Sequence, residues 1–402
     1  MAVLLSTGEV VQQKEDHSIP LFRLAFRPFF LLGSLFAVIA LSLWGLMLSS
    51  NLQVTPYGGQ LWWHMHEMLF GFVSAIVIGF LLSAVQTWTR VPSIKGPLLM
   101  GLVMIWLLAR VLLFFPFLPN ALTAFIDLLF LPFAAGALLY PIAKVKLWRN
   151  AIFMPILLFM TACNFMMHYA VAMNQPSYQQ VAATAMVMVV TLLMTIMAGR
   201  VFPMFTANGT QTEKVVPISW LEKSTVIGTL LGGLLSLHWF SVIPYINAWI
   251  FFTVALLHAY RVFRWKIWVT LKTPLVWSLH LSYWAIPLGF LLLGLSEITR
   301  SISQSQALHS FTVGAMSSMI LAMISRVSLG HTGRKIAVGK VMAAAFILIF
   351  LATLVRVFGS LLITNYSLVL QVSLVLWIGA YAIFISQYAR LLTTPRIDGS
   401  PG

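Results

Sequence analysis

The sequence predicts an all-α integral membrane protein with about twelve transmembrane helices. Sixty per cent of its 402 residues are hydrophobic and only 8% are charged, whereas a soluble domain carries roughly a quarter charged residues. The mean hydropathy is +0.95. Apolar runs of about 20 residues recur along the chain, and a helix of that length crosses the hydrocarbon core of a bilayer. No segment between these runs is long enough to form a soluble domain.

Twelve apolar runs follow one another, separated by short links. Links such as FPFLPN and MNQPS contain the proline, asparagine and glycine residues that are typical of turns. The predicted spans are 24–48, 61–85, 98–115, 120–143, 151–173, 179–200, 220–240, 244–263, 274–296, 304–327, 340–359 and 367–390. They form one transmembrane domain, residues 23–392, between an N-terminal tail, 1–22, and a C-terminal tail, 393–402. The mixed polar start of the chain does not predict a cleavable signal peptide.

The basic residues predict the orientation of the protein. Loops on the cytoplasmic side of a membrane carry an excess of lysine and arginine. With a cytoplasmic N-terminus, only Arg110, Arg300 and Arg356 of the 24 basic residues fall on the outer side. We therefore predict that both termini are cytoplasmic. Because the positive charge lies in short loops between apolar runs, we do not expect nucleic-acid binding. A single cysteine, Cys163, excludes an internal disulfide and cysteine-rich metal sites.

Parts of the sequence resemble one another. In the second span, His66 is followed five residues later by a glycine, and His309 in the tenth span is followed by a glycine at the same distance. The span after each carries an arginine near its outer end, Arg110 in LLARV and Arg356 in TLVRV. These similarities predict three parallel repeats of four helices.

Histidines gather at one depth of the predicted bundle. Five of the nine fall in its outer third: His64, His66, His168, His238 and His309. Histidine is a common metal ligand and an axial ligand of haem. Ionisable residues within spans face the bundle interior and are candidates for function. The alternative is that these histidines only bridge helices through hydrogen bonds.

The segment LWWHMHEMLFGF, residues 61–72, places His64, His66 and Glu67 within four residues. Positions two apart on a helix diverge by about 200°, so each histidine needs partners from other helices. In the fifth span, His168 shares a face with Asn164.

An unpaired ionised glutamate costs several kcal/mol in apolar surroundings. We therefore expect Glu67 to pair with Arg110, with Arg356 or with a histidine N–H. It would either orient a ligand histidine or form a plain buried ion pair.

Nearly the whole chain resembles the NnrS family. The resemblance is carried by the stretches FRLAFRPFFLLGSLFA, LWWHMHEMLFGF and GRVFPMFTANGT. The resemblance implies a twelve-span bacterial inner-membrane protein that contains haem and copper. It also implies expression under nitric oxide control and a role in withstanding nitrosative stress during nitrogen-oxide metabolism.

On this basis we assign cofactor roles as a hypothesis. His66 and His309 would ligate haem, and His64 and His168 would serve as copper ligands or second ligands. Glu67 with Arg110 or Arg356 would orient these ligands or neutralise a haem propionate. The site would face the periplasm, where a small ligand such as nitric oxide reaches it through lipid.

Other functions stay open at this point. The chain is similar in architecture to the catalytic subunit of haem-copper oxidases, but its tenth span has one histidine in place of a His-x-His pair, so analogy of fold implies no activity. An enzyme that turns over nitric oxide would need electrons from quinol or a cytochrome. A sensor or scavenger would bind without turnover. A transporter for a metal or a small anion, without stoichiometric haem, is the alternative class.

Overall fold

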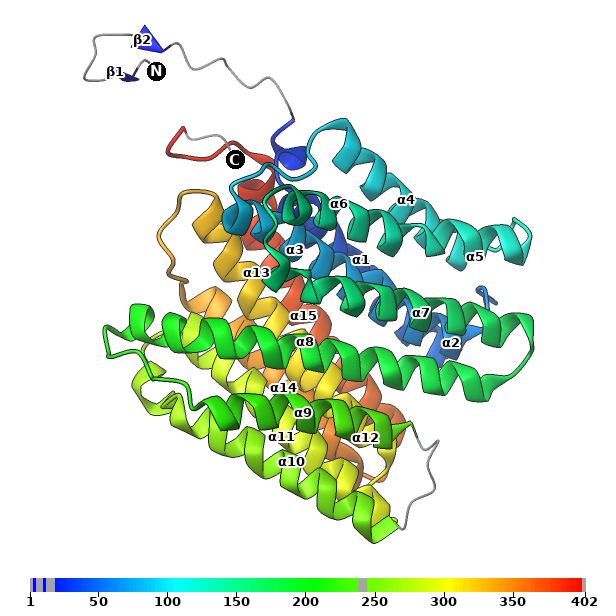
Figure 1. Ribbon diagram of the computed structural model, residues 1–402. Helices are drawn as coiled ribbons and strands as arrows, with labels where there is room; N and C mark the ends of the chain where they lie inside the picture. Colours follow the sequence, from blue (N-terminus) through cyan, green and yellow to red (C-terminus); the bar gives the residue numbers. More distant parts are fainter. Residues whose placement is uncertain (1–2, 5–9, 12–18, 238–243, 400–402) are drawn as a thin grey trace.

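The computed structural model describes residues 3–4, 10–11, 19–237 and 244–399. His238, most of the predicted N-terminal tail and the last three residues of the C-terminal tail lie outside these ranges. In the described part, long helices run side by side and form one bundle (Figure 1). The two short strands, β1 (Val3–Leu4) and β2 (Val10–Val11), pair with each other in antiparallel fashion. The predicted all-α membrane fold is therefore confirmed.

The bundle is built from helices whose ends mostly fall at the proline-, glycine- and asparagine-bearing links. Short 3₁₀ turns lie at Pro20–Phe22, Trp148–Ile152 and Ile267–Thr270. The α-helices are α1 (Phe26–Leu48), α2 (Gln60–His66), α3 (Ser74–Thr89), α4 (Pro97–Phe114), α5 (Asn120–Leu128), α6 (Phe130–Lys144), α7 (Phe153–Ala172), α8 (Pro176–Thr210), α9 (Ser219–Ser236), α10 (Pro244–Arg264), α11 (Pro274–Ile298), α12 (Gln304–His309), α13 (Ser318–His331), α14 (Lys340–Leu362) and α15 (Tyr366–Thr393).

Eleven helical segments of the described chain are long and apolar enough to cross a membrane. They match eleven of the twelve predicted spans. The remaining span corresponds to α9, which has 18 residues and carries the charged pair Glu222 and Lys223 in its first five positions. The ion pair between Glu222 and Arg261 of α10 explains how this helix accommodates a carboxylate. The chain is thus a multi-pass membrane protein.

The most buried spans lie at the centre of the bundle. Gln60–Thr89 and Pro176–Thr210 bury a larger share of their apolar length than any other span in the described residues. Neighbours in sequence pack together, as α7 does with α8 and α14 with α15. Helix α1 also packs against α15, which brings the start and the end of the described bundle together (Figure 1).

The second and tenth predicted spans share an unusual backbone feature. Helix α2 ends at His66 and continues as a π-helix over Glu67–Val73. Helix α12 ends at His309 and continues as a π-helix over Ser310–Ser317. Such segments are rare and occur frequently at functional sites. The shared feature supports the correspondence between these two spans, and the threefold repeat stays a prediction.

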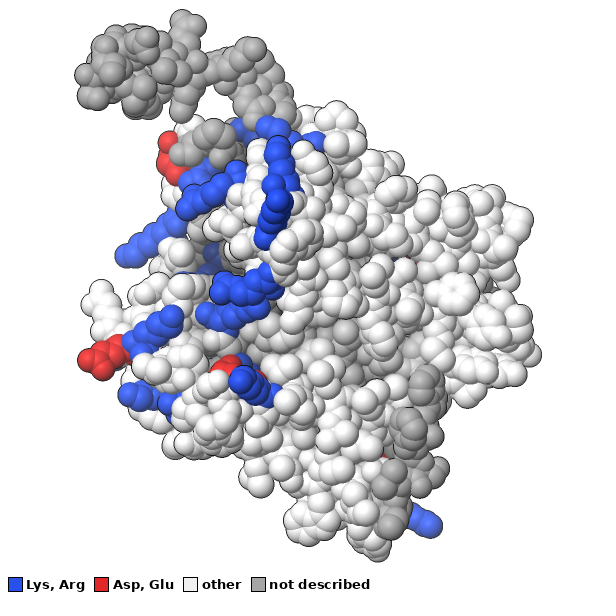
Figure 2. Space-filling view, viewed as in Figure 1, with Lys and Arg blue, Asp and Glu red and all other residues white. Residues whose placement is uncertain are grey.

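Lysine and arginine side chains lie mainly along one edge of the molecule. Figure 2 shows them in a row from the N-terminal end down that edge, whereas most of the remaining visible face carries none. This asymmetry is the one expected from cytoplasmic loops of a membrane protein. The cytoplasmic location of the termini stays a prediction.

Candidate metal centre

A group of polar side chains is buried between the helices of the first half of the chain. All of them are at most 5% exposed. They come from the loop before α2, the π-helix that follows α2, and helices α2, α4, α5 and α7. The members of this group, called the His66 cluster below, are Tyr57, His66, Glu67, Arg110, Asp127, Asn164 and His168.

Asp127 of α5 is the centre of the cluster. Its Oδ2 atom lies 3.1 Å from Nε2 of His66 and 3.1 Å from Nε2 of His168. The same oxygen accepts a hydrogen bond of 2.8 Å from Nδ2 of Asn164. Its other oxygen, Oδ1, accepts from the Arg110 guanidinium. One carboxylate therefore connects α2, α4 and α7 to α5.

Glu67 provides the second carboxylate. Nη1 of Arg110 lies 3.0 Å from each of its two oxygens. Nδ1 of His66 lies 3.0 Å from Oε1. Of the partners that the sequence left open for Glu67, the structure shows Arg110 and the N–H of a histidine, His66. Arg110 bridges Glu67 and Asp127, so each carboxylate has a guanidinium partner in this dry environment.

Hydrogen bonding places two protons on the His66 ring. Nδ1 faces the Glu67 carboxylate, and Nε2 lies 2.8 Å from Oδ1 of Asn164 as well as close to Asp127. Oxygen acceptors therefore surround both ring nitrogens, and an imidazolium satisfies all of them. With that charge the cluster is neutral, because two carboxylates balance one guanidinium and one imidazolium. Buried charges are tolerated only in such compensated groups.

His168 is held in its neutral form by Tyr57. Nε2 of His168 donates to Asp127, and Nδ1 lies 3.2 Å from the Tyr57 hydroxyl. Burial, together with the nearby Asp127 carboxylate, raises the pKa of Tyr57 to about 12. Tyr57 therefore keeps its proton at neutral pH and donates it to Nδ1. Without a metal, its two neighbours favour the tautomer with the proton on Nε2. Ligation through Nε2 would move that proton to Nδ1, where the Tyr57 hydroxyl would accept it.

Aromatic rings shield the cluster. The Trp62 indole stacks on the His66 ring with a centroid distance of 4.5 Å and an interplanar angle of 11°. Its Nε1–H donates to the Met167 carbonyl at 2.9 Å. The Phe70 ring lies 5.2 Å from His66 on a centroid basis. This apolar cover excludes water and strengthens the electrostatic interactions inside.

The donor atoms of His66, Asp127 and His168 suit a metal ion. One nitrogen from each histidine and one carboxylate oxygen lie within 4.8 Å of one another. Imidazole and carboxylate bind divalent and copper ions. Because a ligand histidine must give up the proton on the coordinating nitrogen, metal binding would displace a proton from Nε2 of His66. The N–H of Nδ1 would still donate to Glu67, which would orient the ring.

His64 and His309 form a second group, called the His309 pair below. His64 points away from the His66 cluster, as the helical spacing predicts, and stacks on Trp44 with a centroid distance of 4.5 Å. Nδ1 of His309 donates to the Ser305 carbonyl at 2.7 Å. Both rings are half-buried, and the two histidines lie within electrostatic range of each other.

Arg356 belongs to the neighbourhood of the His309 pair. It lies within electrostatic range of both histidines and over the Tyr366 ring, 6.0 Å from its centroid. Nε2 of His309 makes no hydrogen bond with the residues that the structure describes. Its tautomer, with Nδ1 protonated, leaves Nε2 as a potential ligand.

The structure thus divides the predicted site residues into two groups. His66 lies with His168, Glu67 and Arg110, and His64 lies with His309 and Arg356. Within the described residues, His66 and His309 share no hydrogen bond or ring contact. The sequence reasoning missed Tyr57 and Asp127. The aspartate in the apolar run AFIDLLF indicates a candidate functional residue, because ionisable residues within spans are rare.

Two other buried histidines, His258 and His280, bond to hydroxyl groups of neighbouring helices. The ring nitrogens of His258 lie 2.8 Å from the Tyr283 hydroxyl and 3.0 Å from the Thr229 hydroxyl. Nε2 of His280 lies 2.8 Å from the Thr206 hydroxyl. His280 is therefore a suitable control for substitutions of the histidines in the His66 cluster and the His309 pair.

Gly71 gives the Arg110 side chain its space. A Cβ atom at this position would lie 2.8 Å from Nη1 of Arg110 and 2.8 Å from a ring carbon of Phe36. Gly71→Ala is therefore expected to displace the guanidinium and to lower the free energy of unfolding by about 1–3 kcal/mol, measured as thermal unfolding in detergent. Gly101→Ala in α4 meets nothing within 4 Å and should be neutral. Equal stability of the two variants would contradict the close packing of Arg110.

Comparison with known proteins identifies the family. A comparison with curated proteins finds no match. The family model described as NnrS protein matches residues 20–396. That range includes all seven members of the His66 cluster and the His309 pair. Because the match extends over nearly the whole chain, this protein belongs to the NnrS family.

Proposed function

We propose that this protein is a haem- and copper-containing membrane protein of the bacterial nitric oxide response. It would bind or process a small diatomic ligand in the inner membrane, close to the periplasmic side. The observation that carries the proposal is the buried group of His66, Asp127 and His168, whose ligand atoms converge within 4.8 Å. Membership of the NnrS family supports it.

Copper is assigned to the His66 cluster. Without a metal, two carboxylates and one guanidinium leave one negative charge, which the proton on His66 neutralises. A monovalent copper ion that replaces this proton would leave the net charge unchanged. His66, Asp127 and His168 would hold the ion, and Glu67 would keep the His66 ring in place. The bound copper would supply a one-electron redox centre that can also bind a diatomic ligand.

Haem is assigned to the His309 pair, which changes the pairing suggested by the sequence. The hydrogen bond from Nδ1 of His309 to the Ser305 carbonyl leaves Nε2 unprotonated, so His309 could hold a haem iron through that nitrogen. His64 is the candidate for a second ligand, and the Trp44 ring stacked on it provides apolar packing. Arg356, within electrostatic range of both histidines, would neutralise a propionate. Arg110 is engaged by two carboxylates and takes no part.

The chain's own residues would define access to the copper site. Trp62 and Phe70 cover His66 with apolar rings, and an uncharged, weakly polar ligand such as nitric oxide could approach the site across these rings. Tyr57 holds a proton next to His168. Turnover would require an electron donor, quinol or a cytochrome, whereas sensing or scavenging would not.

Metal binding at the His66 cluster is expected to strengthen as pH rises. Ligation requires Nε2 of His66 to lose its proton, so each metal ion bound should release about one proton. With one proton exchanged, the apparent affinity should rise at most about tenfold per pH unit. Isothermal titration calorimetry in two buffers of different ionisation enthalpy counts the protons released. A count of zero would contradict an imidazolium in the cluster.

The direct test of the proposal is the metal content of the purified protein. Elemental analysis for iron and copper, beside optical spectra of the oxidised and reduced protein, should give both metals in stoichiometric amounts and a Soret band. Addition of nitric oxide should then shift that band. A folded protein that contains neither metal after expression with haem and copper would refute the proposal.

Metal transport is the second candidate function, favoured by the burial of the His66 cluster between helices. A transporter would move copper across vesicle membranes and would contain no stoichiometric haem. The same elemental analysis, combined with copper uptake into vesicles, distinguishes the two functions.

A further inference from the structure

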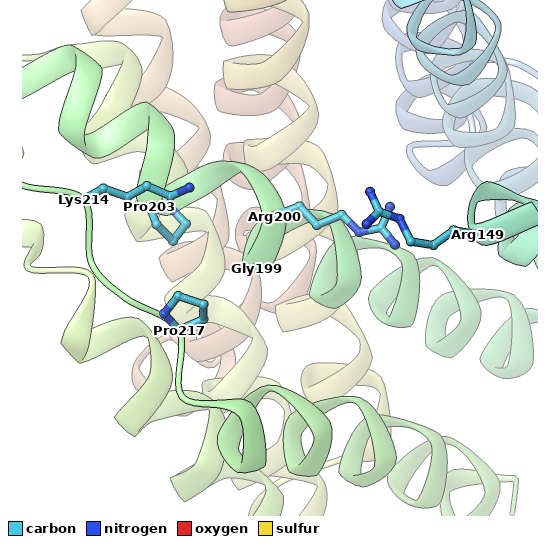
Figure 3. Close-up of a pocket in the computed structure, with 6 residues that line it drawn as sticks. All are labelled: Arg149, Gly199, Arg200, Pro203, Lys214 and Pro217. Atoms are coloured by element: carbon cyan, nitrogen blue, oxygen red, sulfur yellow. The ribbon is translucent and has the colours of Figure 1, made fainter. Parts of the chain in front are cut away.

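A cavity of about 460 Å³ lies where α8 bends, and it shares no lining residue with the His66 cluster or the His309 pair. Figure 3 shows the side chains that line it. They come from the 3₁₀ turn before α7, from α8 and from the segment that follows α8. The lining residues are Arg149, Gly199, Arg200, Pro203, Lys214 and Pro217.

The charge of this cavity is uncompensated. Three of its six lining residues are cations and none is a carboxylate. The side chains of Arg149 and Arg200 extend toward each other (Figure 3). Within the described residues, neither guanidinium makes a hydrogen bond or an ion pair. Like charges that line one cavity repel each other, so the arrangement favours an anion there.

Two residues of α8 that line the cavity, Gly199 and Pro203, have special backbone roles. A Cβ atom at Gly199 would overlap the Arg261 guanidinium and the Glu222 carboxylate, so this position lacks a side chain. Pro203, inside α8, cannot donate a hydrogen bond to the carbonyl four residues before it, and it bends the helix there. Glu222, beneath Gly199, is already paired with Arg261. It is therefore not available to neutralise the arginines of the cavity.

Lys214, the third cation, lies in the segment between α8 and α9, and a hydrogen bond holds this segment against the bundle. Arg264 of α10 donates from Nη2 to the Val216 carbonyl at 3.1 Å. This hydrogen bond ties the segment after α8 to the bundle two residues beyond Lys214. Topology alone requires basic residues on one side of the membrane. It does not require three of them to converge from separate segments on a single cavity.

We propose that this cavity binds a phosphate group. Arginine guanidinium groups match phosphate oxygens in geometry and charge, and lysine adds a point charge. The cavity lies on the edge where basic side chains gather (Figure 2), so the headgroup of an anionic phospholipid and free phosphate can both reach it. The site lies apart from the proposed metal centres and does not depend on them.

The test measures ligand-dependent thermal stabilisation of the full-length protein in detergent. The ligands are phosphatidylglycerol, phosphatidylcholine as a lipid of zero net charge, and inorganic phosphate. We expect stabilisation by phosphatidylglycerol or phosphate, and a dissociation constant at least tenfold weaker in the double variant Arg149→Gln/Arg200→Gln. Arg390→Gln, which removes one exposed charge at the end of α15, should respond like the wild type.

The ligand series identifies the source of the phosphate group. Stabilisation by phosphatidylglycerol alone assigns a lipid headgroup, and stabilisation by inorganic phosphate assigns a free anion. An equal response of the double variant and the wild type, or an equal response to phosphatidylglycerol and phosphatidylcholine with none to phosphate, would overturn the proposal. If the double variant does not fold, Lys214→Gln, which lies outside the helices, replaces it and should weaken binding at least threefold.

Discussion

Asp127→Ala is expected to lower the free energy of unfolding by about 3–5 kcal/mol, because the substitution leaves buried cations without their partner. The carboxylate of Asp127 accepts from Arg110, Asn164 and His168 and faces His66. Removing it leaves the cluster with a net positive charge and three orphaned donors. Thermal or chemical unfolding of the purified protein in detergent measures the effect.

The matched control is Asp398→Ala. Asp398 is paired with Arg396 at 2.5 Å, but its side chain is 40% exposed, and exposed ion pairs contribute only about 0–1 kcal/mol. Asp127→Asn keeps the shape and removes only the charge, so its effect should fall between those of the two alanine variants. If Asp127→Ala were no more harmful than Asp398→Ala, the neutral, fully bonded cluster described above would be wrong.

His168→Ala is expected to weaken copper binding and to leave haem in place. The substitution deletes one of the three converging ligands of the His66 cluster and does not touch the His309 pair. We expect copper affinity to fall at least tenfold, with an unchanged Soret band. His309→Ala should do the opposite, because His309 is the proposed haem ligand. Copper and iron contents and optical spectra measure both effects.

His280→Ala is the matched control for these variants. His280 is a buried histidine with a hydrogen bond to Thr206 and no place in either group, so both metals should be retained. Loss of both metals in all three variants would indicate general misfolding. Loss of haem in His168→Ala with copper retained would reverse the assignment proposed here.

The fold could be predicted from sequence because a bilayer imposes a strong constraint. Each span must be long and apolar, and eleven of the twelve predicted runs are helices of that kind. The need of Glu67 for a cation or a histidine N–H followed from the cost of burying a charge, and the divergence of His64 and His66 followed from helical spacing. These inferences need only local geometry or a general energetic rule.

The composition of the site could not be predicted in the same way. Which partners meet depends on how helices pack, and the sequence does not show that α5 brings Asp127 between His66 and His168. The backbone also changes from α-helix to π-helix at Glu67, which alters the angle between successive side chains. An argument based on α-helical periodicity alone therefore does not fix the faces of all the residues after His66. The rule that an ionisable residue within a span is a candidate for function applies to Asp127, but the sequence analysis did not include this residue.

The most direct test of the central claim, a metal centre at the His66 cluster, is X-ray absorption at the copper edge of the copper-loaded protein. The account predicts nitrogen and oxygen neighbours with imidazole scattering from His66 and His168, and loss of one imidazole in His168→Ala. A spectrum that is unchanged in His168→Ala, or that shows sulfur neighbours from methionine or Cys163, would place the copper elsewhere and contradict the claim.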